Sequence, residues 1–169
     1  MLYLFDPETK KYNEFSLTRP DYDLKNSLIT EGHREGMDYY AEYISKVVDG
    51  RLIPIRDESY VYPEILKVVK EFKDGKWITL EDYVIELKEN ACFYIERKMI
   101  NNELKPMRIS KYFNNKEGVV VEQYQKFNEK GETIENLIRE VKSSNGELVK
   151  GINFNTEEDC KNFIKAYSY

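Results

Sequence analysis

The sequence contains few of the residues that carry metal, redox and acid–base chemistry. Its 169 residues include two cysteines and one histidine. A structural zinc site uses about four Cys or His ligands and a catalytic site about three, so these residues cannot form a zinc site without carboxylate help. Cys92 and Cys160 each lie within an apolar pattern, which is typical of buried thiols rather than of a disulfide framework. The sequence therefore predicts no metal centre and no cofactor.

Glycine-rich phosphate-binding loops are absent as well. The eight glycines match neither the dinucleotide fingerprint nor the loop that ends in Gly-Lys-Ser/Thr. Two carboxylate pairs leave an oxygen-ligated magnesium or calcium site open as an alternative: Asp21 with Asp23, and Asp57 with Glu58. The calcium-loop pattern with its central glycine does not occur around either pair.

Long hydrophobic runs are also missing. The longest uncharged apolar runs, such as residues 91–95, are far shorter than the roughly 20 residues that a membrane-spanning helix needs. Residues 1–7 have no positive lead, and an acid and a proline stand where the apolar stretch of a signal peptide would continue. We therefore expect a cytoplasmic protein without a membrane partner.

Charge and composition limit the partners. The net charge is −5, and this balance disfavours nucleic acid, because affinity for phosphate backbones comes largely from clustered cations. Apolar residues make up 41% and charged residues 34% of the chain, as in folded soluble domains. The 14 tyrosines indicate either the AT-rich codons of a low-GC genome or a recognition surface, since tyrosine supplies large amphipathic contact area.

Turn residues recur through the second half of the chain. Apolar-rich segments alternate with turn clusters at residues 101–102, 114–118, 128–131 and 144–146. Asn and Gly accept the positive φ of tight hairpins, so residues 91–155 are predicted to form an antiparallel meander. Residues 132–142 fit a helix stripe as well as a strand, and we favour the strand.

The first half shows a different pattern. Residues 2–5 and 12–17 flank Asp6-Pro7 and predict a β-hairpin, and residues 18–36 read as a long loop. Apolar spacing of three and four predicts helices over residues 37–48, 63–73 and 80–88, with Gly50 as the stop of the first. Thr156 and Asp159 have capping-box spacing and predict a closing helix over residues 156–169.

These elements predict an α+β fold. An N-terminal hairpin and three helices would pack on a four- to five-stranded antiparallel meander, followed by the C-terminal helix. No linker rich in Gly, Pro or Ser separates the mainly helical residues 1–89 from the meander, so we expect residues 1–169 to form a single domain.

His33 offers the main candidate for catalysis. It lies in a glycine-flanked stretch with Arg34, Glu35 and Asp38 nearby, and imidazole titrates near neutral pH, as a general base requires. The simpler interpretation, which we favour, is a solvated loop residue before a helix, because a base also needs an orienting partner and a nucleophile within reach. We therefore assign no catalytic residue.

Tyrosines offer the main candidate for binding. Tyr39 and Tyr43, four residues apart on the predicted helix, and the alternating Tyr60 and Tyr62 could contact another protein. We expect a non-enzymatic, stoichiometric binding protein, such as an inhibitor or an immunity or anti-defence protein of a low-GC bacterium or phage. The alternatives are a small enzyme that uses His33 and a nucleic-acid-binding module that uses the sheet face. The sequence leaves the oligomeric state open.

Overall fold

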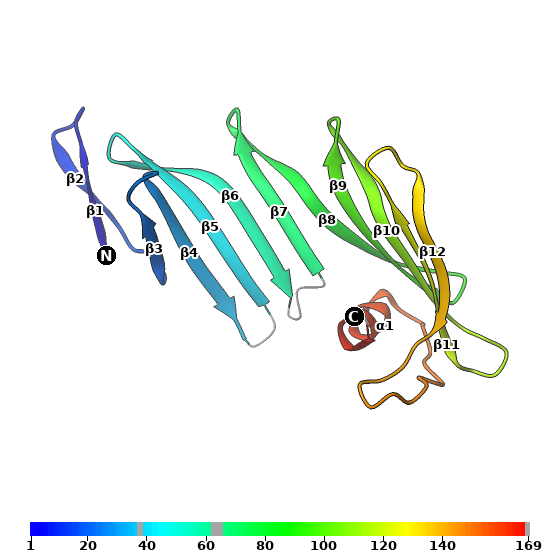
Figure 1. Ribbon diagram of the computed structural model, residues 1–169. Coiled ribbons are helices and arrows are strands. Elements are labelled where there is room, and N and C mark those ends of the chain that lie inside the picture. Colours follow the sequence, from blue (N-terminus) through cyan, green and yellow to red (C-terminus); the bar gives the residue numbers. More distant parts are fainter. Residues whose placement is uncertain (37–38, 62–65, 168–169) are drawn as a thin grey trace. The chain divides into compact units, whose positions relative to one another are not determined.

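The computed structural model describes residues 1–36, 39–61 and 66–167. They form two antiparallel sheets and one C-terminal helix, α1 (Glu157–Tyr167) (Figure 1). Strands β1 (Leu2–Asp6) and β2 (Lys11–Phe15) form a two-stranded sheet. The ten-stranded sheet contains β3 (Pro20–Asp23), β4 (Leu28–Glu35), β5 (Tyr39–Val48), β6 (Arg51–Val61), β7 (Leu66–Lys73), β8 (Lys76–Lys88), β9 (Ala91–Ile100), β10 (Glu103–Asn114), β11 (Val120–Phe127) and β12 (Thr133–Glu140).

Each strand of the larger sheet lies beside the next strand along the chain, in the order β12 to β3. Four of the connecting turns have two consecutive residues with positive φ, at residues 49–50, 74–75, 89–90 and 101–102. This backbone is that of type I′ hairpin turns, whose twist matches the right-handed twist of the paired strands. Asn, Asp and Gly adopt it readily, which is why the chain reverses at these positions.

The α+β prediction with three helices is wrong. Residues 18–36, predicted as a loop, contain β3 and β4, and the three predicted helices are replaced by β5, β7 and β8. Two of the predicted helices, over residues 37–48 and 63–73, begin in segments that lie outside the described residues, namely 37–38 and 62–65. The apolar spacing fits a helix because side chains on both faces of β5 are partly exposed, which weakens the alternation, whereas the Tyr, Ile and Val residues of β5 favour a strand. Gly50 is a hairpin residue rather than a helix stop.

Three local predictions are confirmed. The opening hairpin is β1 and β2, and the Asp6 carboxylate accepts a hydrogen bond from the main-chain N–H of Glu8 at 2.9 Å. Residues 132–142 contain β12, a strand. The capping box is present at the start of α1, where Thr156 Oγ1 accepts from the N–H of Asp159 at 3.1 Å and Asp159 Oδ2 accepts from the N–H of Thr156 at 2.9 Å.

The chain divides into two compact units, Met1–Leu80 and Glu81–Tyr169, with the boundary inside β8. In the first unit the hairpin β1–β2 docks on the turn between β5 and β6. The Asn13 side chain donates to the carbonyl of Gly50 at 3.1 Å, and Arg51 pairs with Glu8 at 2.8 Å. The prediction of a single domain stays a prediction.

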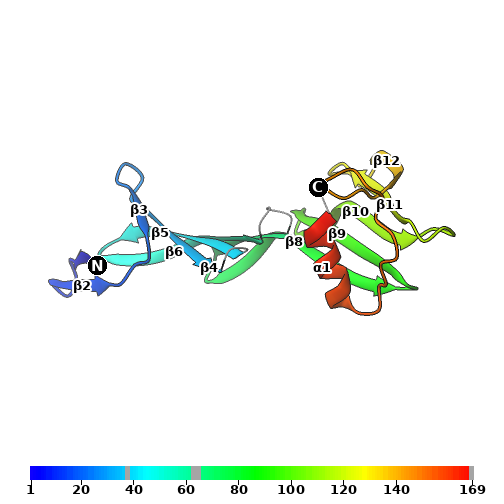
Figure 2. The same ribbon diagram turned by 90° about the horizontal axis from the view of Figure 1, so that it is seen from below.

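Helix α1 packs on one face of the second unit (Figure 2). The ring of Phe163 contacts Tyr112 of β10 and Phe154, each with centroids 5.1 Å apart. Cys92 of β9 and Cys160 of α1 are both fully buried and free. Within the described ranges, no helix has the length and apolar character needed to cross a membrane.

Candidate functional site

The residues predicted around His33 do not all come together. His33 and Glu35 point to the same face of β4, while Arg34 points to the opposite face, because side chains alternate along a strand. His33 Nε2 lies 3.6 Å from Glu35 Oε1, and the two side chains are 45% and 75% exposed. Asp38 lies outside the described residues. The His33–Glu35 pair is thus a surface contact on a strand.

Tyr39 and Tyr43 lie on the same face of the sheet as His33. They flank the buried Ala41 on β5, and the register places Ala41 opposite His33 and Tyr39 opposite Glu35. Burial, together with the negative charge of Asp57, raises the pKa of Tyr43. Its hydroxyl, like that of an ordinary tyrosine, is protonated near neutral pH and can donate a hydrogen bond.

Tyr60 belongs to the opposite face. It pairs with Tyr40 across β5 and β6, with ring centroids 5.2 Å apart, and the Tyr40 hydroxyl donates to Glu42 at 2.8 Å. Tyr62 lies outside the described residues. Tyr39 and Tyr60 therefore cannot contribute to one flat contact surface, and the predicted tyrosine set is divided between two faces.

The hairpin β1–β2 exposes three aromatic side chains that sequence reasoning missed. Tyr3, Phe5 and Tyr12 are 57%, 50% and 70% exposed. Phe5 and Tyr12 are cross-strand partners whose rings meet edge to face at 5.4 Å. We call these three residues the hairpin patch. The opposite side of β1, with Leu2 and Leu4, lines a cavity against the larger sheet.

A signal for the hairpin patch was present in the sequence. Residues 2–5 read Leu-Tyr-Leu-Phe, so both faces of β1 are apolar. A two-stranded hairpin can pack only one of its faces on the rest of the molecule. The aromatic face therefore has to be exposed. Alternation of apolar and polar residues cannot indicate this, because both faces of β1 are apolar.

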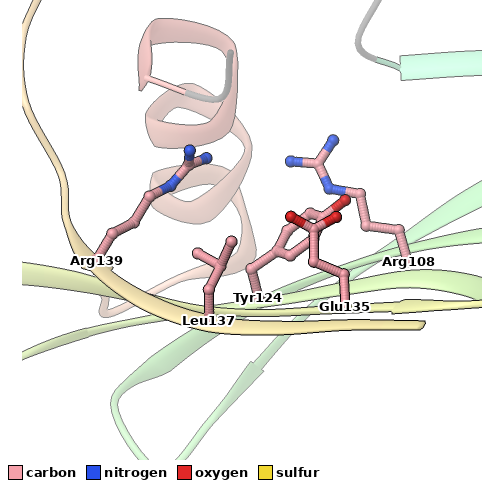
Figure 3. Close-up of a pocket in the computed structure, with 5 residues that line it drawn as sticks. All are labelled: Arg108, Tyr124, Glu135, Leu137 and Arg139. Atoms are coloured by element: carbon pink, nitrogen blue, oxygen red, sulfur yellow. The ribbon is translucent and has the colours of Figure 1, made fainter. Parts of the chain in front are cut away.

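A polar cavity of about 180 Å³ lies in the second unit, on the strands β10, β11 and β12 (Figure 3). Its lining residues are Arg108, Tyr124, Glu135, Leu137 and Arg139. The Arg108 guanidinium lies over the rings of Tyr94 and Tyr124, at 5.5 and 5.1 Å from their centroids. Burial works against the charge of Arg108, but Glu96, Tyr112 and Glu122 together outweigh burial and raise the pKa of Arg108, so the side chain stays cationic.

The buried carboxylate of Glu122 organises this cavity. It is 2% exposed, accepts from the Tyr112 hydroxyl at 3.0 Å and from Arg139 Nε at 2.5 Å, and has Arg108 Nη2 at 3.8 Å. The two arginines are therefore held in place by the protein itself. Such an arrangement can receive an acidic or hydrogen-bond-accepting group, but it places no nucleophile beside a base.

Other predicted groups have structural partners. Glu58 is held by Lys67 at 2.6 Å and Arg56 at 3.0 Å. Of the three sheet tyrosines on which bases could stack in the nucleic-acid alternative, Tyr94 and Tyr112 are buried, whereas Tyr124 is partly exposed. Across the described part of the chain, no group of three or more His, Cys, Asp or Glu residues is placed to hold a metal ion.

Comparisons with known proteins give little further information. No protein-family model matches the chain, and no curated protein matches it. A crystal structure of a protein of unknown function from Bacteroides fragilis NCTC 9343 is similar over 68% of this chain and 93% of that chain, with 15% identity and a TM-score of 0.35. A likeness this low carries no argument about function.

Proposed function

We propose that this protein is a non-enzymatic binding protein that covers a surface of another protein. The observation that carries the proposal is the hairpin patch. Tyr3, Phe5 and Tyr12 lie side by side on one face of a hairpin and are each at least half exposed. Exposed apolar patches of this kind mark interaction sites, and tyrosine is among the residues enriched in protein interfaces.

The arrangement of the hairpin supports a rigid binding surface. Within the hairpin, the Asp6 carboxylate fixes the turn by accepting from the N–H of Glu8. The Asn13 side chain joins the hairpin to the carbonyl of Gly50 in the turn between β5 and β6. Aromatic side chains on a fixed hairpin lose little conformational freedom on binding. Tyr39 and Tyr43 are proposed as a second contact region on the face that also carries His33.

The biological setting is proposed from the composition. A stoichiometric inhibitor, or an immunity or anti-defence protein of a low-GC bacterium or phage, fits an acidic, tyrosine-rich chain. A cytoplasmic location is supported by the free, buried thiols of Cys92 and Cys160, because a reducing compartment keeps thiols in this form.

Capture from an extract of the native host, followed by binding measurements with the purified partner, tests the proposal. Tyr3→Ala and Tyr12→Ala are each expected to weaken binding by more than about 1 kcal/mol, or at least roughly fivefold in Kd. The matched control is Leu24→Ala, which alters a residue of the same unit that is 88% exposed and should leave Kd unchanged. Equal capture by all variants would contradict the proposal.

The enzyme alternative has its own test. His33→Ala should leave the fold and any turnover by the purified protein unchanged if His33 is only a surface residue. If the purified protein consumes a metabolite and His33→Ala abolishes that turnover while the variant stays folded, the enzyme interpretation replaces the binding proposal.

A further inference from the structure

The two ends of the ten-stranded sheet differ in how well they are protected against further pairing. β3 has four residues, begins with Pro20 and carries Asp21 and Asp23. Short length and proline both discourage another strand from pairing with an edge. β12 has eight residues and no proline, and all of them except Leu137 are exposed. The edge of β12 is therefore the one that can accept a strand.

The hydrogen bonds next to β12 show which main-chain groups point outward. The N–H of Val141, directly after β12, donates to the carbonyl of Val120 at 2.9 Å, toward β11. Main-chain groups alternate in direction along an antiparallel strand. The residues that direct N–H and C=O toward the free edge are therefore Asn136, Ile138 and Glu140. The regular edge begins at Glu135, because the register with β11 shifts just before it.

The charged residues of β12 are self-complementary. Glu135 and Arg139 lie two positions on either side of Leu137, and their side chains project from the same face of the strand (Figure 3). An antiparallel copy of β12 with Leu137 opposite itself would place Glu135 of one protomer opposite Arg139 of the partner subunit. Arg139 of the first protomer would then lie opposite Glu135 of the partner subunit. Opposite charges in directly facing positions stabilise a strand pair.

We propose that two copies of this chain associate through β12, antiparallel, about a twofold axis at Leu137. Asn136 and Ile138 of each copy then form main-chain hydrogen bonds with the partner subunit, since both residues face the edge. Leu137, Glu135 and Arg139 occupy the non-hydrogen-bonded positions, where facing side chains approach most closely. Closed twofold pairing is the commonest way in which identical chains associate.

Neighbouring registers lack this complementarity. With Asn136 at the axis, Arg139 faces Thr133 of the partner subunit, and with Ile138 at the axis it faces Leu137 of the partner subunit. Neither register brings Glu135 to Arg139. The Arg139 side chain is 52% exposed even though its Nε binds Glu122, so the guanidinium is accessible from the edge.

Sedimentation equilibrium of the full chain over a wide concentration range tests the pairing. The wild-type protein is expected to show a reversible monomer–dimer equilibrium. Ile138→Pro removes an outward N–H but no bond to β11, so it should leave the fold intact, as judged by circular dichroism, and abolish the dimer. The matched control Ile138→Ala keeps the N–H and should still dimerise.

Charge exchange tests the register. Glu135→Arg places like charges opposite each other and should weaken the dimer at least tenfold, and so should Arg139→Glu. An equimolar mixture of the two variants should restore association as a heterodimer, because each facing pair is again of opposite sign. Should Arg139→Glu fail to fold, Glu135→Arg and Ile138→Pro still decide the matter. A wild-type protein that is monomeric throughout, or a dimer that survives Ile138→Pro, would overturn the proposal.

Discussion

Glu122 is the residue on which the polar interior of the second unit depends. A carboxylate removed from water is tolerated only when charged and hydrogen-bonding partners replace the lost hydration. Tyr112 and Arg139 supply those partners from β10 and β12, on either side of Glu122 in β11. A single side chain thus links three strands, and it also fixes the arginines of the cavity.

Replacing Glu122 with Ala should therefore destabilise the protein by about 3 kcal/mol, because it removes the carboxylate that accepts hydrogen bonds from Tyr112 and Arg139. Tyr112→Phe, which removes only one of the hydrogen bonds to Glu122, should cost about 1.5 to 3 kcal/mol. Urea unfolding followed by circular dichroism measures both. The control is Glu117→Ala in an exposed turn, expected within about 0.5 kcal/mol of wild type. A loss for Glu122→Ala no larger than this control would show that the network is not stabilising.

Glu58 makes the stability of the first unit depend on pH. Hydrogen bonding to Lys67, together with the charges of Lys67 and Arg56, lowers the pKa of Glu58. A carboxyl whose pKa is lower in the folded state stabilises that state at neutral pH. This contribution is lost as the pH falls from the unfolded pKa of about 4.3 through the lower folded value.

The expected outcome is a free energy of unfolding that decreases in this acidic range, with a smaller decrease in Glu58→Gln. Denaturant unfolding at a series of pH values measures it. Glu8→Gln serves as the control, because its pair with Arg51 is exposed on both sides and such pairs contribute little. Identical pH profiles for wild type and Glu58→Gln would show that another group is responsible.

At the scale of elements, turn chemistry proved more informative than apolar spacing. Gly50 is predicted as a helix stop, yet Asp49-Gly50 is a hairpin turn with two residues at positive φ. Asp74-Gly75, which follows the predicted helix over residues 63–73, is a turn of the same kind. Those pairs, read together with Asn101-Asn102, could have extended the meander into the first half of the chain. The apolar stripe over residues 37–48 fits a helix because side chains on both faces of β5 are partly exposed, so the alternation on which strand prediction depends is weak.

The candidate site could be predicted only in part. Tyr39 and Tyr43 do share one side of their element, although the reason is strand alternation rather than helical spacing. The polar cavity lined by Arg108 and Arg139 could not be predicted from the sequence, because its residues come from three strands whose register no local pattern determines. The exposure of the hairpin patch depends on how the β1–β2 hairpin packs on the turn between β5 and β6, and this tertiary contact leaves no local pattern in the sequence.

Gly50 and Gly75 form a matched pair that tests how the hairpin docks. Both have positive φ, at 72° and 76°, so alanine should cost about 1 kcal/mol at either from the backbone alone. A Cβ at Gly50 would lie 2.3 Å from the carbonyl oxygen of Phe5, whereas one at Gly75 meets nothing within 4 Å. Gly50→Ala should therefore cost a further 1 to 3 kcal/mol or so by overpacking.

Denaturant unfolding of the two variants measures this difference. Hydrogen exchange of the β1–β2 amides provides the second readout, and it should become faster in Gly50→Ala alone. Equal stability and equal exchange in both variants would mean that the hairpin moves away without cost, and the hairpin patch would then not be a rigid surface.

For the whole molecule, the two compact units differ in what holds them together. Four buried apolar side chains among the described residues belong to the first unit: Ile29, Ala41, Leu66 and Val69. Thirteen belong to the second unit, where α1 adds Cys160, Phe163 and Ile164 against the sheet. Apolar burial is the main favourable term in folding. The second unit therefore has the stronger core.

This difference should appear in native-state hydrogen exchange of the full chain. Amides of β9–β11 should exchange at least about tenfold more slowly than those of β4–β6, since each factor of ten corresponds to about 1.4 kcal/mol of opening free energy and opening follows local burial. Phe163→Ala, which removes a ring that contacts Tyr112 and Phe154, should accelerate exchange in β9–β11 and leave β4–β6 unchanged. If Phe163→Ala accelerated both regions equally, the units would open together, and the strength of each core could not be assigned separately.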